Sequence, residues 1–236
     1  RGGLEDRFDP SEQRPGRACF GGLSETLQAI ASHSGHLVPT HPAETLLAMM
    51  DKRLCHRVLG DADVPVPPAL PAERIRDAAA LRTALQGGNH HAVFVKPRWG
   101  SSGAGVLAYR WQGEREQLTT TARLDGDAVH NDKHLHTYTD RASIDCLLNR
   151  ILGDGAVIER WLPKAGAAGG PFDLRVVTVG GEPAQRVARV GRGTVTNLHL
   201  DSARLAFVEA LAPWGPSKEA EVLAVCRAAA ACFPSH

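Results

Sequence analysis

The chain has 236 residues, enough for one large domain or two small ones with a real hydrophobic core. Its 27 basic and 26 acidic residues give a formal net charge of +1, a balance that argues against a nucleic-acid partner. No apolar run approaches the roughly 18 residues that a membrane span requires, and no signal peptide opens the chain. We therefore expect a globular protein with neither a nucleic-acid nor a membrane partner.

The five cysteines are scattered along the chain and include no C-x-x-C pair. Isolated thiols in odd number argue against a disulfide framework and indicate a reducing compartment, so a cytoplasmic location is expected. The chain begins at Arg1 and ends at His236, just after an apolar helical stretch. On this pattern we expect a fragment that is incomplete at both ends.

The first half of the chain has a helical pattern after about 20 polar residues that predict little regular structure. Caps and breakers bound this pattern: Ser24 stands in the first helix's opening turn, Pro42 in the first turn of the second, and Gly87 after the third. Helices are therefore expected over residues 23–35, 42–63 and 73–86.

The second half of the chain mixes strand and helix patterns. Two apolar strands flank a glycine-rich loop, and two others flank Gly180-Gly181, a favoured composition for a two-residue hairpin turn. Residues 112–140 are polar and rich in histidine, and they predict a loop or a weak hairpin. The pattern predicts an α+β fold with antiparallel strands at 92–97, 105–110, 155–162, 173–179 and 183–190, and helices at 141–152 and 219–233.

A lysine stands directly before a loop of small residues in the stretch VFVKPRWGSSGAGV. Backbone N–H groups in such a loop can approach phosphate oxygens closely, and the ammonium group of Lys96 adds a strong charge. The order differs from the Walker and dinucleotide-binding loops because Lys96 precedes the glycines. The stretch indicates a phosphate site, with a plain glycine-rich hairpin as the alternative.

Two further stretches carry unusual polar residues. In VIERWLP a carboxylate, Glu159, lies inside an apolar strand, where burial is costly without a partner such as a nucleobase amino group. The alternative is an edge strand with Glu159 in water. In the 173–190 hairpin, Asp173 shares a face with Arg175, whereas Arg186 and Arg189 point to opposite faces. One of these two arginines can serve phosphate or a carboxylate substrate, and surface ion pairs are the alternative.

In this order the motifs resemble those of the ATP-grasp superfamily, most closely its RimK-type and glutathione-synthetase-like ligases, over about residues 40–200. MMDKRLCHRVLG resembles the D-K segment, VFVKPRWGSSGAGV the phosphate loop, VIERWLP the adenine hinge, and DLRVVTV…TNLHL the D-x-R…R…N-L-H stretch. The resemblance implies an ATP-grasp fold, in which two α+β subdomains with antiparallel sheets clamp ATP. Residues 1–40 would be the remnant of a preceding substrate domain, 41–155 the first subdomain with a helical lead-in, and 156–236 the second subdomain, incomplete at its C-terminus.

The resemblance also implies roles for individual residues. The ATP-binding set is Lys52, Lys96, Gly100, Ser101, Ser102, Gly103 and Gly105 at the phosphates, Glu159, Arg160, Trp161 and Leu162 at the adenine hinge, and Asp173. In this set Glu159 binds the adenine amino group, the backbone of Trp161 and Leu162 reads the base, and the 100–105 loop closes as a flexible lid. Arg175, Arg189 and Asn197 would be catalytic, facing, with Asp173, the γ-phosphate and the acceptor carboxylate.

The implied activity is ATP-dependent joining of a small-molecule or peptide carboxylate to an amine through an acylphosphate, with Mg²⁺ bridging the phosphates. An ATP-grasp kinase and a non-catalytic nucleotide-binding module are the alternatives. A homodimer is a further expectation, although the resemblance leaves the oligomeric state open.

The sequence departs from the family pattern in two places. The acidic residue and the E-x-N that hold magnesium in the family are not found, so the metal ligands are unassigned and this fragment alone is expected to be inactive. Lys164 stands near the position where many relatives carry an acidic ribose ligand. His130, His134 and His136, with Asp132 among them, are spaced like a metal clip, but a solvated loop is the favoured interpretation.

Overall fold

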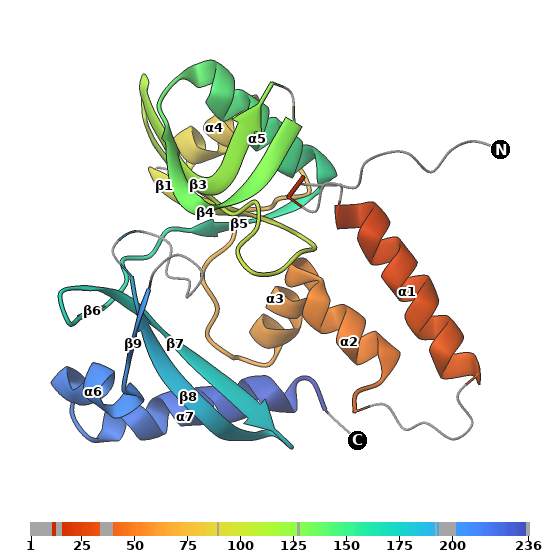
Figure 1. Cartoon of the computed structure of the whole chain (residues 1–236), viewed down its shortest axis with the longest axis vertical. Coiled ribbons are helices and arrows are strands. Elements are labelled where there is room, and N and C mark those ends of the chain that lie inside the picture. Colours follow the sequence, from red (N-terminus) through yellow and green to blue (C-terminus); the bar gives the residue numbers. More distant parts are fainter. Residues whose placement is uncertain are drawn as a thin grey trace.

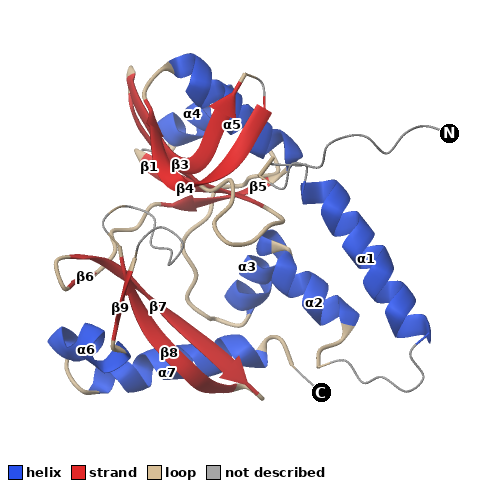
Figure 2. Cartoon of the chain, viewed as in Figure 1, coloured by secondary structure: helices blue, strands red, loops and turns tan. Residues whose placement is uncertain are grey.

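The computed structural model describes residues 11–12, 16–33, 40–88, 90–126, 128–191, 193 and 202–234. Its helices and strands form an α+β arrangement with two antiparallel sheets, as the sequence predicts (Figures 1 and 2). In chain order the elements are α1 (Gly16–His33), α2 (Ala43–Met50), α3 (Lys52–Asp61), α4 (Ala78–Gly87), β1 (Ala92–Pro97), β2 (Leu107–Gln112), β3 (Arg115–Asp125), β4 (Ala128–Tyr138), α5 (Arg141–Asp154), β5 (Ala156–Arg160), β6 (Gly166–Ala167), β7 (Gly170–Val179), β8 (Glu182–Val190), β9 (Ala203–Leu205), α6 (Phe207–Leu211), the 3₁₀ helix η2 (Ala212–Trp214) and α7 (Ser217–Ala231).

The first sheet has the strand order β4-β3-β2-β1-β5, and helices α4 and α5 cover one of its faces. Side chains alternate across a strand, so Val93 and Val95 of β1 and Ile158 of β5 point into the core with the two helices. The same alternation places Lys96 and Glu159 on the opposite face. One face of this sheet is therefore a hydrophobic core and the other carries the predicted site residues.

Residues 112–140 form a long hairpin, where the sequence predicted a loop or a weak hairpin. Strands β3 and β4 have 11 residues each and pair from Leu118↔Tyr138 to Asp125↔Ala128, with a register shift between Thr120 and Ala122. Leu118 and Thr120 are fully buried. Threonines occupy several positions of β3, so the alternation of apolar and polar residues was not apparent in the sequence. Threonine is nevertheless a good strand former.

The second sheet has the order β6-β7-β8-β9, and its main feature is the predicted β7–β8 hairpin. Gly180 and Gly181 have φ angles of 57° and 84°, the left-handed values that a tight two-residue turn requires at both positions. Phe172 of β7 and Ala188 of β8 pack against Ala210 of α6. Figure 1 shows α7 running across this hairpin and the first sheet above it.

The stretch predicted as one helix over residues 42–63 is two helices, α2 and α3, separated by Asp51. Asp51 has an extended backbone (φ −88°, ψ 100°), and its carboxylate accepts hydrogen bonds from the backbone N–H groups of Arg53 and Leu54. Aspartate is a strong N-cap because it satisfies N–H groups that have no partner within the helix. The helical pattern of apolar residues continues on both sides of Asp51, so the periodicity of the sequence did not reveal the break.

The N-terminal helix α1 begins at Gly16, earlier than predicted, and the third predicted helix begins later, at Ala78 after the capping residue Asp77. Among the described helices, none combines the length and apolar character that a membrane crossing needs. All five cysteines lie in described segments and carry free thiols.

Candidate functional site

Several predicted site residues lie on the sheet faces opposite the covering helices α4–α5 and α6–α7, which are called the helix-free faces below. Lys52 at the start of α3 and the 100–105 loop lie outside the sheets. Lys96 and Glu159 are on the face of the first sheet opposite α4 and α5, and Asp173 and Arg189 are on the face of the second sheet opposite α6 and α7. Lys164 lies within electrostatic range of Asp173 and Arg189 on the second sheet and of Lys96 on the first. The two polar faces are therefore turned toward the same part of the molecule.

Lys96 and Glu159 form an ion pair with a distance of 2.5 Å between Nζ and Oε2. They come from the neighbouring strands β1 and β5, where Glu159 is paired with Phe94, two residues before Lys96. The side chains are 30% and 13% exposed. The expectation that a buried Glu159 needs a partner is confirmed, but Lys96 is that partner, so burial alone does not require a nucleobase.

Lys52 lies beside this ion pair and contacts the glycine-rich loop. Its Nζ donates a hydrogen bond of 2.6 Å to the carbonyl oxygen of Gly100, and its backbone N–H donates to the carbonyl of Arg98. Burial and the charge of Lys96 lower the pKa of Lys52, against the opposing charges of Asp51 and Glu159. The structure thus brings together the two lysines and the loop that the sequence placed 44 residues apart along the chain.

The 100–105 loop is a chain of tight turns in which several residues adopt left-handed backbone conformations. Ala104 N–H bonds to the Ser101 carbonyl, and Val106 N–H bonds to the Gly103 carbonyl. Left-handed φ angles cost little for glycine, which explains its spacing here, whereas Ser102 adopts this conformation as a non-glycine residue. The φ angles are 136° at Gly100, 59° at Ser102, 78° at Gly103 and 65° at Gly105.

The hinge residues after Glu159 are partly engaged by the protein itself. Arg160 N–H bonds to the carbonyl of Pro68, and Trp161 N–H bonds to the carbonyl of Ala92. The Trp161 N–H group therefore extends the sheet, and the prediction that the backbone of Trp161 and Leu162 reads a base stays a prediction. Leu162, 47% exposed, follows at the sheet edge.

The indole of Trp161 packs on the helix-free face of the first sheet. It contacts the ring of Phe94 at 4.9 Å between centroids, and the guanidinium of Arg110 lies 4.2 Å from its ring centre. Cation–π contacts of this kind add stability beyond burial. Phe94 and Arg110 escaped the sequence analysis because each follows the ordinary alternation of a strand.

On the second sheet, Arg189 binds Asp173 through two hydrogen bonds of 2.6 and 2.8 Å. Arg175 is exposed on the same face by the period-two rule. Arg186 lies on the opposite face, where it pairs with Glu219 of α7. Of the two arginines, Arg189 is therefore the one that shares a face with Asp173 and Arg175; the predicted Asn197 lies outside the described residues.

Lys164, noted in the sequence only as a departure from a family pattern, belongs to the same charged region. Desolvation of its ammonium lowers its pKa although the residue as a whole is exposed; Asp173 opposes this effect, and Arg189 and Lys96 add to it. Lys164 therefore interacts electrostatically with charged groups on both sheets. Together, the cations Lys52, Lys96, Lys164 and Arg189 and the carboxylates Glu159 and Asp173 leave a net charge of +2.

The histidines of β4 do not form a metal clip in the described part of the chain. Asp132 accepts hydrogen bonds from the backbone N–H of His134 and from the ring of His136. Within the described residues no group of three or more His, Cys, Asp and Glu side chains could hold a metal ion. No Mg²⁺ ligand is therefore assigned among the described residues.

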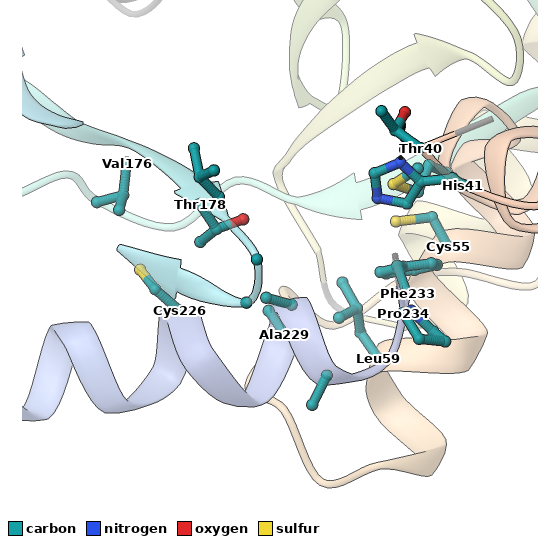
Figure 3. A pocket seen from close by; sticks show the side chains of 16 residues that line it. Thr40, His41, Cys55, Leu59, Val176, Thr178, Cys226, Ala229, Phe233 and Pro234 are labelled. Atoms are coloured by element: carbon teal, nitrogen blue, oxygen red, sulfur yellow. Dashed lines mark hydrogen bonds between the residues drawn. The ribbon is translucent and has the colours of Figure 1, made fainter. Parts of the chain in front are cut away.

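A cavity of about 910 Å³ lies apart from these residues, between the tip of the β7–β8 hairpin, the C-terminal end of α7 and helices α2 and α3 (Figure 3). Its lining is mostly apolar, with Leu59, Val176 and Phe233 among the larger side chains. None of the predicted site residues lines it. The cavity is therefore separate from the predicted phosphate site.

Comparison with known proteins supports the fold. No protein-family model matches the sequence, and no curated protein matches it either. Among solved structures, the chain is similar to the crystal structure of D-cycloserine synthetase DcsG, an ATP-grasp ligase, with a TM-score of 0.53 and 16% sequence identity. The match covers 92% of this chain and 62% of the DcsG chain, so this chain spans less than two thirds of that protein's length. At this level of identity the likeness concerns the fold alone, and the chain therefore has an ATP-grasp-like fold.

Proposed function

We propose that this chain is the nucleotide-binding part of an ATP-dependent ligase that joins a carboxylate to an amine. The observation that carries the proposal is the convergence of Lys52, Lys96 and the 100–105 loop, with Lys164 and Arg189 nearby on the side of the second sheet. Excess positive charge in a partly desolvated region is unfavourable unless an anion neutralises it. A nucleoside triphosphate supplies that charge, and backbone N–H groups of the loop can bind its oxygens.

In this proposal the hinge residues Glu159 to Leu162 hold the adenine without the N–H groups of Arg160 and Trp161, which bond within the protein. The RimK-type order of the motifs supports the assignment. Lys52 and Lys96 bind the phosphates, which requires the Lys96–Glu159 ion pair to share its charges with the ligand. Arg189 and Arg175, which share one face of the second sheet, would bind the γ-phosphate and the incoming carboxylate in this proposal. The protein contributes positioning and cationic stabilisation of the transferring phosphoryl group.

The proposed reaction has two steps. A carboxylate oxygen of the substrate attacks the γ-phosphorus, the bond to the β-phosphate oxygen breaks, and ADP leaves with an acylphosphate formed. The amine nitrogen then attacks the acyl carbon, the C–O bond to phosphate breaks, and inorganic phosphate leaves as the amine loses a proton. When bound with the nucleotide, Mg²⁺ would supply further positive charge for the transferring phosphoryl group, and no described residue is assigned to hold it.

A thermal shift with nucleotides tests the binding part of the proposal. A non-hydrolysable ATP analogue at about 100 times its dissociation constant should stabilise the fold by about 2.7 kcal/mol, which raises Tm by roughly 5–10 °C. ADP should give a smaller shift and adenosine the smallest, because the cationic cluster contacts the phosphates. Equal shifts with all three ligands, or none with any, would contradict a site built for a triphosphate.

Hydroxylamine tests the chemistry. Acylphosphate formation from ATP and a panel of amino acids and small carboxylates should yield hydroxamates and ADP, whereas phosphate transfer to a hydroxyl yields ADP without hydroxamate. The second outcome would replace the ligase by a kinase. The assay should be run on this chain and on a longer chain of the same protein, with Mg²⁺ present in both.

The affinity for the ATP analogue should fall as pH rises from 8 toward 10. The pKa values of Lys52 and Lys164 are both lowered from 10.5, so these cations lose their protons at a lower pH than an ordinary lysine. A bound polyanion favours the protonated forms, so binding takes up protons in this range. The phosphate's own last pKa is about 6, so the ligand charge stays constant. Calorimetric titration at several pH values measures this, and a flat profile would contradict it; Lys52→Met should reduce the slope.

A further inference from the structure

Asp51 is a buried carboxylate next to the phosphate lysine, and it does more than cap a helix. It is 4% exposed and accepts from Arg53 N–H at 3.0 Å and from Leu54 N–H at 3.3 Å. It also receives three hydrogen bonds from the guanidinium of Arg98, at 2.6 to 2.9 Å. A forked charge-assisted contact of this kind is among the strongest and most directional in proteins.

Arg98 is the residue through which Asp51 reaches the phosphate loop, because Arg98 comes two positions before Gly100. The backbone of Arg98 is held on both sides: its N–H bonds to the Gly155 carbonyl at 3.0 Å, and its carbonyl accepts from Lys52 N–H at 3.0 Å. The side chain of Lys52 then bonds to the Gly100 carbonyl at 2.6 Å. Helix α3 and the start of the loop are thus joined by the side-chain fork and by two further hydrogen bonds.

The neighbouring residue Trp99 connects the start of the loop to helix α1. Its ring stacks on Phe20 of α1 at 5.5 Å between centroids, and the Arg98 guanidinium lies 4.7 Å from the ring centre. Gly16 of α1 approaches so closely that an added Cβ would lie 3.0 Å from the Trp99 carbonyl oxygen. Trp99 therefore anchors the loop, which agrees with a structural role for this side chain.

The far end of the loop has a separate attachment. Gly105 N–H donates a 3.0 Å hydrogen bond to the side-chain oxygen of Asn131 in β4. The loop is consequently fixed at residues 98–100 and at Gly105, and the exposed Ser101 and Ser102 lie between the two attachments. Any movement of the loop over a ligand is confined to this short middle segment.

We propose that Asp51 is a positioning residue which, through Arg98, holds the phosphate loop and Lys52 in one fixed arrangement. Its meaning for catalysis rests on the proposed function, but the positioning itself does not. Asp51 touches neither phosphate nor substrate in this scheme. It sets the distance between the backbone N–H groups of the loop and the Lys52 ammonium, so both meet a polyphosphate together.

Hydrogen exchange on the protein without nucleotide tests the positioning directly, with Asp51→Asn as the key variant. Asparagine caps helices as well as aspartate does, so this change keeps the start of α3 and removes the charged acceptor of Arg98. The backbone amides of Lys52 and Ala104, which bond to the Arg98 and Ser101 carbonyls, should exchange at least tenfold faster, while those of Val95 and Leu107 in the adjoining strands stay unchanged. Arg98→Met should match this effect, and Arg98→Lys should give a smaller one because lysine keeps the charge without the fork.

Asp140→Asn is the matched control, since Asp140 caps α5 in the same way through Ser143 N–H. It should leave exchange in the loop unchanged. Unchanged loop amides in Asp51→Asn would overturn the proposal, and so would equal acceleration in the strands, which would show a general structural role. In nucleotide titrations Asp51→Asn should weaken the ATP analogue about tenfold and leave adenosine unaffected. If no variant binds nucleotide, the proposed function fails while the exchange result still decides the role of Asp51.

Discussion

Replacing Arg82 with methionine should lower the free energy of unfolding by about 3–5 kcal/mol, the largest stability loss that we expect from a single substitution in this chain. Arg82 lies on α4, is 8% exposed, and forms two hydrogen bonds with Glu116 of β3 at 2.9 and 2.7 Å. It also bonds to Asp145 of α5 at 2.5 Å. The guanidinium therefore links both covering helices to the first sheet.

The loss is large because Glu116 would remain buried. Its side chain is 5% exposed, and its other close contacts are the hydroxyl of Tyr109 at 3.0 Å and the mostly exposed Arg141 at 3.5 Å. Breaking a buried pair from one side leaves a carboxylate that has lost its partner and cannot regain its water. Burial and the negative charge of Glu116 also raise the pKa of Tyr109, so the phenol stays neutral: it donates a hydrogen bond to Glu116 but supplies no positive charge.

Chemical and thermal unfolding measure this effect. At 2–4 °C per kcal/mol for a chain of this size, Tm should fall by roughly 6–20 °C. Arg123→Met is the matched control, because Arg123 is 46% exposed and its partner Asp125 lies at 3.6 Å; this pair should contribute about 0–1 kcal/mol. Combining Arg82→Met with Glu116→Gln should recover part of the loss. Similar losses for the two arginine variants would show that the Arg82 network contributes no more than a surface pair.

Lys96→Met should weaken binding of the ATP analogue by about tenfold to a hundredfold, since one charge-assisted hydrogen bond contributes about 1.5–3 kcal/mol. Methionine keeps most of the side chain's volume while it removes the charge. The same change leaves the half-buried Glu159 without its 2.5 Å partner and places negative charge where phosphates must bind. Both effects oppose the ligand, so this variant should be the most damaging single lysine replacement in the site.

Calorimetry on Lys96→Met, Glu159→Gln and the double variant separates the two effects. The double variant should bind the analogue better than Lys96→Met alone, because the repelling carboxylate is gone. Lys218→Met is the control; Lys218 lies on α7 and pairs with Glu221, away from both helix-free faces, so its loss should leave affinity unchanged. Wild-type affinity in Lys96→Met would remove the central argument for the phosphate site.

Local patterns predicted the strands of this protein well where the chain alternates cleanly. The β7–β8 hairpin and its Gly180-Gly181 turn follow from short-range rules, since a two-residue turn with left-handed residues specifies strand pairing. Helix ends were predicted less accurately, because a capping side chain stops a helix without changing the apolar pattern. The apolar pattern of the sequence runs past Asp51 without a break. Only the extended backbone of Asp51 and its hydrogen bonds show that there are two helices.

The sequence by itself determined the α+β class, the glycine loop beside Lys96 and the polar residues of the hairpin, because strand period, turn chemistry and motif order are local properties of the chain. Tertiary structure alone decided that Lys96 is the partner of Glu159 and that Arg189 and not Arg186 faces the helix-free side. It alone also brought Lys164 and Asp51 next to the predicted site residues. These pairings join residues far apart in sequence. They depend on which face of each sheet the helices cover, and burial of apolar side chains across the whole fold sets that choice.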